Sequence, residues 1–131
     1  MSFGADGCSG YVEVKATAGW QSTGQSLGPN QRLRIDDVIG RWTGNVHVDT
    51  LHSVEGPTVD VYVAPAGYPL PGADENKLLV RVGSKPSVMP AIGTVFTAGS
   101  FGAGGPITFT MNDNGYHDNF GSLWVKFSVL E

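Results

Sequence analysis

Glycine and proline set the strongest limit on what this chain can fold into. The 131 residues include 19 Gly and 8 Pro. Gly or Pro interrupts the windows of about eleven residues in which a helix would keep its apolar spacing. Apolar and polar residues alternate with a period of two instead, as in strands that face a core on one side and water on the other. The alternating segments are 12–18, 32–36, 46–48, 59–63, 77–82, 107–111 and 123–129.

Seven or eight short strands separated by turn-rich segments are typical of a sandwich or barrel. We therefore predict an all-β fold, a two-sheet antiparallel β-sandwich of about eight strands, of the jelly-roll or galactose-binding-like type. The length allows one compact domain, which we assign to residues 1–131. The Pro-rich segment Pro65–Asn76 predicts a long surface loop, and the Gly-rich segment Ala98–Pro106 predicts a hairpin connection.

Charge and composition exclude several classes of partner. The formal net charge is −4, and the eight Lys and Arg residues are scattered, so we expect no nucleic-acid binding. No run of about 18 apolar residues occurs, so we expect no membrane insertion. Residues Met1–Gly10 lack the basic start and apolar run of a secretory signal, which indicates a cytoplasmic location or export by a non-classical route. The single Cys8 excludes an internal disulfide.

The densest chemical signal is the segment Asn112–Asn119, which reads NDNGYHDN between two predicted strands. Five of its eight residues are Asp or Asn, whose oxygens on short stems suit a loop that wraps closely around Ca²⁺. Gly115 permits a backbone turn that points a carbonyl inward. Asp113 and Asp118 would repel each other without a cation and would become ligands with one. The pattern differs from an EF-hand, which needs flanking helices and a Glu at the twelfth loop position.

The same residues fit a second interpretation, in which Asp and Asn only cap a tight turn between strands. The flanking sequence favours the first. The Gly19–Gly24 and Gly40–Thr43 segments and the stretch from Ile107 to Val129 resemble the PA-IL-like galactose-binding lectins, a family of bacterial calcium-dependent lectins. The most specific likeness is a strand followed by Asn112-Asp113, a short loop, Asp118-Asn119 and then Gly121-Ser122.

The resemblance implies a set of Ca²⁺ ligands. Side chains of Asp113, Asp118 and Asn119 would bind the ion, together with the backbone carbonyls of Thr23 and Gly115. Sugar hydroxyls would complete the coordination shell, with galactose as the default sugar. Asp113, Asn114 and Asp118 would also hydrogen-bond to those hydroxyls. The His and Gln that family members use to contact the sugar are absent from the segment 65–74, where Tyr68 could stack on a sugar face instead.

Three functional interpretations follow. The first is a calcium-dependent carbohydrate-binding lectin or module, a possible homo-oligomer because weak sugar sites gain strength from multivalency. The second is a structural calcium site that stabilises the sandwich, with the domain mediating protein association without sugar binding. The third, an enzyme, is not expected, because no motif brings a nucleophile and a base together. The pair Asp36-Asp37 is expected to point to opposite faces of a strand.

Overall fold

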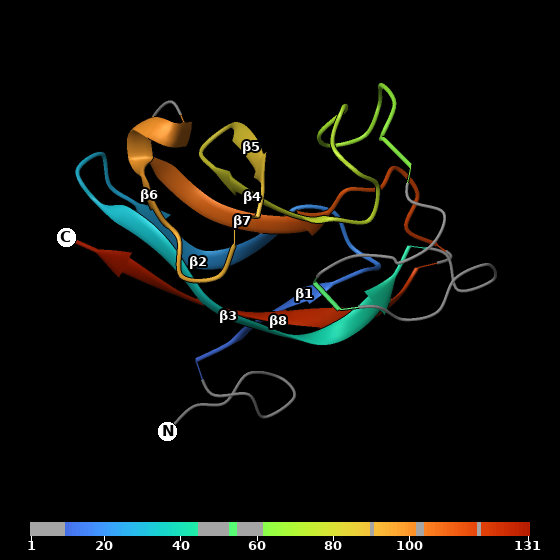
Figure 1. The fold of residues 1–131 in the computed structure, drawn as a ribbon, viewed down its shortest axis with the longest axis horizontal. Helices are drawn as coiled ribbons and strands as arrows, with labels where there is room; N and C mark the ends of the chain where they lie inside the picture. Colours follow the sequence, from blue (N-terminus) through green and yellow to red (C-terminus); the bar gives the residue numbers. More distant parts are fainter. Residues whose placement is uncertain (1–9, 45–52, 55–61, 90, 102–103, 118) are drawn as a thin grey trace.

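Two four-stranded antiparallel sheets stack face to face, which confirms the predicted β-sandwich (Figure 1). A computed structural model describes residues 10–44, 53–54, 62–89, 91–101, 104–117 and 119–131. The first sheet has the strand order β1 (Val12–Lys15), β8 (Phe120–Leu130), β3 (Arg32–Thr43) and β6 (Val95–Thr97). The second has the order β2 (Gln21–Leu27), β7 (Gly105–Met111), β4 (Leu78–Val82) and β5 (Lys85–Val88). A short 3₁₀ turn, Ala98–Phe101, follows β6.

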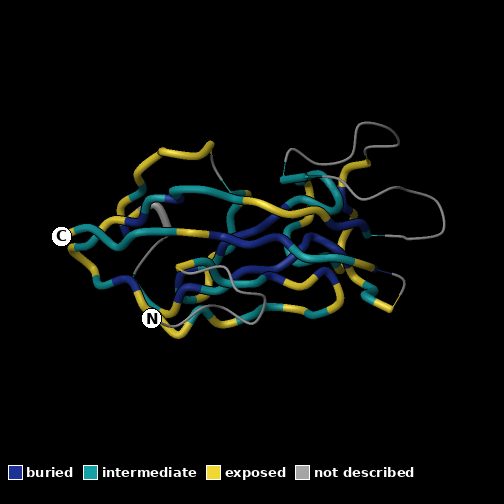
Figure 2. Tube along the Cα trace, turned by 90° about the horizontal axis from the view of Figure 1, so that it is seen from below, coloured by how far each residue is buried: buried dark blue, intermediate teal, exposed yellow. Residues whose placement is uncertain are grey.

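The core lies between the sheets and consists of the apolar residues of the alternating strands. Burial runs along the middle of the strands, while the connections at both ends are more exposed (Figure 2). Because alternate residues of a strand point to opposite faces, β4, β7 and β8 each give two or three fully buried side chains to this core. The fully buried members include Leu33, Ile35, Leu78, Val80, Val82, Ile107, Phe109, Met111, Leu123 and Val125.

Three strands, β2, β5 and β6, were not predicted, because their residues do not alternate in hydropathy. β2 reads QSTGQSL and buries only Leu27 fully, and β5 and β6 are edge strands of four and three residues. The predicted segment 46–48 and most of 59–63 lie outside the described residues, and Val63 forms only an isolated bridge with Asp74. Ala98–Pro106 is not a hairpin, because it leads from β6 in one sheet to β7 in the other.

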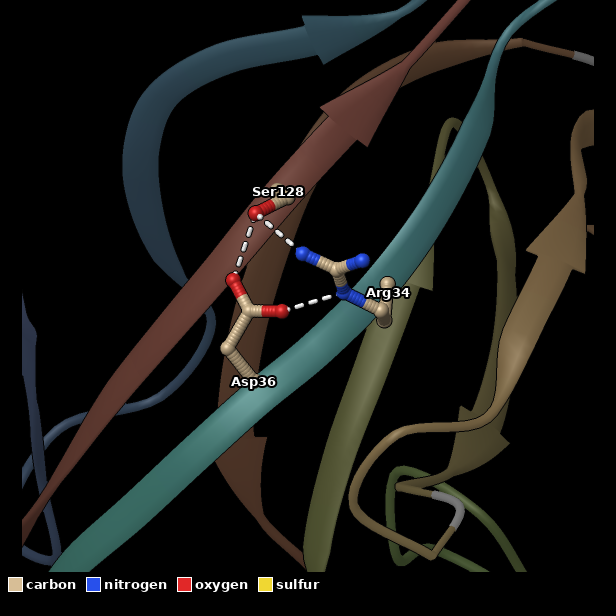
Figure 3. A network of polar contacts seen from close by, with 3 residues as sticks. All are labelled: Arg34, Asp36 and Ser128. Atoms are coloured by element: carbon tan, nitrogen blue, oxygen red, sulfur yellow. Dashed lines mark hydrogen bonds and ion pairs between the residues drawn. The ribbon is translucent and has the colours of Figure 1, made fainter.

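A polar network on the outer face joins the two longest strands. Arg34 Nε donates to Asp36 Oδ1 at 2.5 Å, and the Ser128 hydroxyl donates to Asp36 Oδ2 at 2.5 Å (Figure 3). Arg34 Nη2 also donates to Ser128 Oγ at 3.3 Å. The hydrogen bond from Ser128, followed by the bond and charge of Arg34, lowers the pKa of Asp36. The network therefore ties β3 to β8 across the sheet.

The expectation that Asp36 and Asp37 point to opposite faces is wrong, because β3 contains a β-bulge at this point. The β3–β8 register shifts between Ile35 and Asp37, which leaves Asp36 as an extra residue. Asp37 then faces Lys126 on the outer side of the sheet and accepts a hydrogen bond from Tyr11 Oη at 2.6 Å. A bulge places two consecutive residues against one partner and breaks strict alternation. Both carboxylates thus lie on the outer face, each hydrogen-bonded within the fold.

Candidate functional site

The loop 112–119 connects β7 of one sheet to β8 of the other and closes one end of the sandwich. Three of its polar residues are buried: Asn112 at 0%, Asp113 at 8% and Asn119 at 5% relative exposure. Polar side chains at such depth normally have hydrogen-bond partners, because burial without one is costly. The partners of these three residues show what the loop is built to do.

Asp113 organises the loop around its own carboxylate. Its Oδ1 accepts hydrogen bonds from the backbone N–H of Asn114 at 2.8 Å and of Gly115 at 3.4 Å. This is the Asx-type turn expected when an Asp begins a tight connection. The residue as a whole is buried, and its Oδ2 is inaccessible to solvent. A buried carboxylate is expensive to desolvate unless a positive charge lies beside it.

Asn119 is the last residue of the loop, and within the described part of the chain its side-chain amide has hydrogen-bond partners at the nitrogen only. Its Nδ2 donates to the Ala16 carbonyl at 2.7 Å and points at Met111 Sδ at 3.6 Å. Its Oδ1 is buried and has no hydrogen-bond partner among the residues that the structure describes. An unsatisfied buried acceptor costs about 1–3 kcal/mol. A cation or another donor at this atom would remove that cost.

Asn112 attaches a second loop to the first. Its Oδ1 accepts from the Leu70 N–H at 3.1 Å, while its Nδ2 donates to the carbonyls of Leu70 at 3.1 Å and Asp74 at 3.0 Å. The backbone continues the contact, because Asn76 N–H donates to the Asn112 carbonyl at 2.9 Å. The predicted long loop at 65–76 therefore lies against the loop 112–119, at the end of the molecule away from the C-terminus (Figure 1).

Tyr68 and Glu75 face each other within this second loop. The Tyr68 hydroxyl donates a short hydrogen bond to Glu75 Oε1. That bond raises the pKa of Tyr68 to about 12, with smaller contributions from burial and from the charges of Glu75 and Asp113. The hydrogen bonds of Asn112 to Leu70 and Asp74 bring the loop of this pair next to the loop that carries Asp113. Both residues of the pair are partly exposed.

The end of β3 forms the third side of this region. Thr43 is buried and pairs with Phe120, the first residue of β8 after the loop. A Cβ atom at Gly44 would collide with the side chain of Asn76. Asn76 itself has a φ of 66°, a left-handed conformation that Asn tolerates better than most residues. Gly44 thus allows β3 and the second loop to approach each other closely.

The structure brings together some of the predicted site residues. Asp113, Asn114, Gly115 and Asn119 lie in one loop, with Asn114 exposed and Gly115 partly exposed. Tyr68 lies in the loop that packs against it, whereas Asp118 lies outside the described residues.

Thr23 is not brought to the loop. Its hydroxyl donates to the Ile107 carbonyl at 2.9 Å, and its neighbour Ser22 pairs with Thr108. Since β2 and β7 are antiparallel, Thr23 faces the start of β7, while the loop follows its end at Met111. Ile107 and Met111 are four positions apart along the strand, about 13 Å at 3.3 Å per residue. The carbonyl assigned from the sequence resemblance is therefore too distant to join Asp113.

Sequence reasoning missed the contributions of Asn112, Glu75 and Gly44. The sequence shows Asn112 only as one more oxygen ligand, although its side chain hydrogen-bonds to the second loop. Among the described residues, no three His, Cys, Asp or Glu side chains gather into a group that could hold a metal. An ion in this region would therefore depend on amide and backbone oxygens as well as on Asp113.

Among the residues that the structure describes, no helix is long and apolar enough to cross a membrane.

Comparison with known proteins bears on the fold. No protein-family model matches the chain, and no curated protein matches it. Among solved structures, the chain is similar to one described as "EclA N-terminal domain; PllA-like lectin". The two share 21% sequence identity with a TM-score of 0.62, over 91% of this chain and 94% of that chain. The protein thus has the β-sandwich fold of a lectin over nearly its whole length.

Proposed function

We propose that the protein is a non-catalytic carbohydrate-binding module, of the PA-IL-like kind, that binds sugar through a Ca²⁺ ion held by the loop 112–119. The observation that carries the proposal is the buried Asn119 Oδ1, which no described residue satisfies, in the same loop as the buried Asp113 carboxylate. The lectin-like fold supports it.

The donor set of the loop fits a hard cation. Ca²⁺ takes six to eight oxygen ligands from carboxylates, amide oxygens and backbone carbonyls. Asp113 and Asn119 offer side-chain oxygens and Gly115 a carbonyl, and the sequence adds Asp118. When bound, the ion supplies open positions that sugar hydroxyls fill in place of water. The ion would also neutralise the buried Asp113 carboxylate and satisfy Asn119 Oδ1.

The sugar would lie over the exposed side of the two loops. Asn114 is exposed beside Asp113, so its amide can reach a sugar hydroxyl. Tyr68 is partly exposed on the neighbouring loop and offers an aromatic face, a surface on which apolar C–H groups of a sugar pack well. Galactose is the sugar we propose, from the resemblance of the Asn112–Ser122 segment to the PA-IL-like lectins.

A structural calcium site remains a second candidate, and one observation favours it. Asp113 Oδ1 already accepts two backbone N–H groups, so this carboxylate has a structural role in the connection between the sheets. An ion added there would pin β7 to β8 with protein oxygens alone. The domain would then associate with proteins, and calcium would raise the stability of the domain without any sugar binding.

A glycan array in Ca²⁺, with a duplicate in EDTA, separates the two candidates. The labelled wild-type protein is expected to bind galactosides in Ca²⁺ and to lose them in EDTA. Asp113→Ala is expected to bind no galactoside, either in Ca²⁺ or in EDTA. Asp37→Ala removes a carboxylate from the outer face of β3 and serves as the matched control, with binding retained. Absence of glycan binding in either condition, with Ca²⁺ still raising stability, would favour the structural site.

A further inference from the structure

The pair Tyr68–Glu75 stands apart from the residues assigned to the ion. Glu75 is not among the proposed ligands, and its carboxylate is held by the Tyr68 hydroxyl rather than by a basic residue. The backbone N–H of Glu75 donates to the Tyr62 carbonyl at 2.8 Å. The Glu75 carboxylate is thus an acceptor held in place on the loop beside the proposed site.

The position of the pair is fixed by Asn112. The two attachment points of this side chain, Leu70 and Asp74, lie two residues after Tyr68 and one residue before Glu75. Asn112 also directly precedes Asp113 in the chain. The Asn112 hydrogen bonds therefore hold the main chain of the loop that carries Tyr68 and Glu75 against the loop that carries Asp113.

Two carboxylates of the second loop lie next to each other in the chain. Asp74 and Glu75 are partly exposed, and the Asn112 side chain joins their loop to the one that carries the buried Asp113. Ca²⁺ would compensate the carboxylates that bind it, and Glu75 would keep its charge. A carboxylate accepts a hydroxyl hydrogen bond strongly but repels a second carboxylate or a sulfate at the same distance.

We infer that Glu75, positioned by Tyr68, determines the class of sugar that the site accepts: neutral sugars whose hydroxyl donates to Glu75, with acidic sugars rejected. This inference depends on the proposed function, because it describes the second contact of the same bound sugar. Glu75 supplies the specificity contact, and Tyr68 is a positioning residue. Sites built to hydrogen-bond a hydroxyl discriminate strongly against ligands that leave the acceptor unpaired.

The test compares Glu75→Gln and Tyr68→Phe with the wild type in Ca²⁺. The probes are pairs of sugars that differ by a carboxylate, namely galactose and galacturonate, glucose and glucuronate, and lactose and sialyllactose. Glu131→Gln is the matched control, because Glu131 is also a carboxylate that accepts one side-chain hydrogen bond, from Gln31, but at the C-terminus. Melting temperatures in Ca²⁺ report whether each variant is folded and still responds to the ion.

The wild type is expected to bind the neutral member of a pair more tightly. Glu75→Gln is expected to weaken that binding by roughly tenfold, the scale of one charge-assisted hydrogen bond, and to narrow the preference over the acidic partner. Tyr68→Phe is expected to weaken the binding of the neutral sugar less than Glu75→Gln does. It should reduce the preference for the neutral over the acidic sugar in the same way, which a merely structural role of Tyr68 would not do. Glu131→Gln is expected to match the wild type.

Three results would overturn the inference in distinguishable ways. If Glu75→Gln keeps the wild-type affinity and preference while binding stays calcium-dependent, the inference fails and the proposed function stands. If the wild type prefers the acidic partners in Ca²⁺, the inference fails again, since Glu75 would not repel them. If the wild type binds none of the sugars in Ca²⁺, the proposed function fails and the inference fails with it.

Discussion

The Asn112 side chain pairs with the main chain of Leu70 at both polar groups, with Oδ1 accepting from the N–H and Nδ2 donating to the carbonyl, each at 3.1 Å. This amide-to-peptide contact spans 42 residues of sequence. It joins the connection between the two sheets to the loop that carries Tyr68 and Glu75. The arrangement of the candidate site depends on it.

Replacing Asn112 with Ala should destabilise the protein markedly. The change removes three hydrogen bonds of a fully buried side chain, each with a net contribution of about 1 kcal/mol. We expect the free energy of unfolding to fall by about 2–4 kcal/mol in urea denaturation. Asn114→Ala, at an exposed position of the same loop, should stay within about 0.5 kcal/mol of wild type. Equal stability of the two variants would contradict the role assigned to Asn112.

Adding a methyl group at Gly44 should disturb the second loop through Asn76. Because a Cβ there would collide with the Asn76 side chain, Gly44→Ala should cost about 1–3 kcal/mol, as overpacking does. Asn76→Gly removes that side chain and tolerates the positive φ of 66° at this position. The double variant should therefore recover part of the loss, and a double-mutant cycle measures the coupling. Strictly additive effects would show that the two residues do not meet.

The network of Arg34, Asp36 and Ser128 should make stability depend on pH in acid. The Ser128 hydrogen bond is the first cause that holds the pKa of Asp36 below its ordinary value. A lowered folded-state pKa contributes stability that is present above the unfolded pKa, about 3.9, and is lost as pH falls through the folded value. Ser128→Ala should thus lower stability more at pH 6 than near pH 2. Urea denaturation at both values measures this, and an equal loss at both would exclude the linkage.

Calcium should stabilise the wild type through Asp113 and Asn119. A ligand that binds only the folded state adds about 2.7 kcal/mol at 100 times its Kd, enough to raise the melting temperature by several degrees. Asp113→Ala and Asn119→Ala should lose this increment, whereas Asn114→Ala should retain it. The increment, rather than the absolute melting temperature, is the readout, because Asn119→Ala also loses the bond to Ala16. An equal increment in all three variants would place the ion elsewhere.

Sequence patterns predicted the parts of the fold that follow from local hydropathy. The alternation was sufficient for β4, β7, β8 and the first residues of β3, because these segments give alternate side chains to the core. β2 was missed because its pairing with β7, rather than its own residues, makes it a strand. The bulge at Asp36 arises from the register with β8, which no single-strand pattern contains.

The site was predictable only where its residues are consecutive. The Asn112–Asn119 segment stands out by composition, and the structure keeps Asp113, Gly115 and Asn119 in one loop. The carbonyl assigned to Thr23 was misplaced because the motif Trp-x-x does not report which end of the sheet it occupies. Glu75 and Gly44 gave no signal, since their roles depend on tertiary contacts with Tyr68 and Asn76.

The most direct test of the central claim is the Ca²⁺ affinity of the wild type, measured by isothermal titration calorimetry with and without a saturating galactoside. If the loop holds an ion to which the sugar binds, linkage requires that each ligand tighten the other by the same factor. The account predicts a severalfold tighter Ca²⁺ affinity in the presence of the sugar. An unchanged Ca²⁺ affinity would contradict it, because the ion and the sugar would then not share a site.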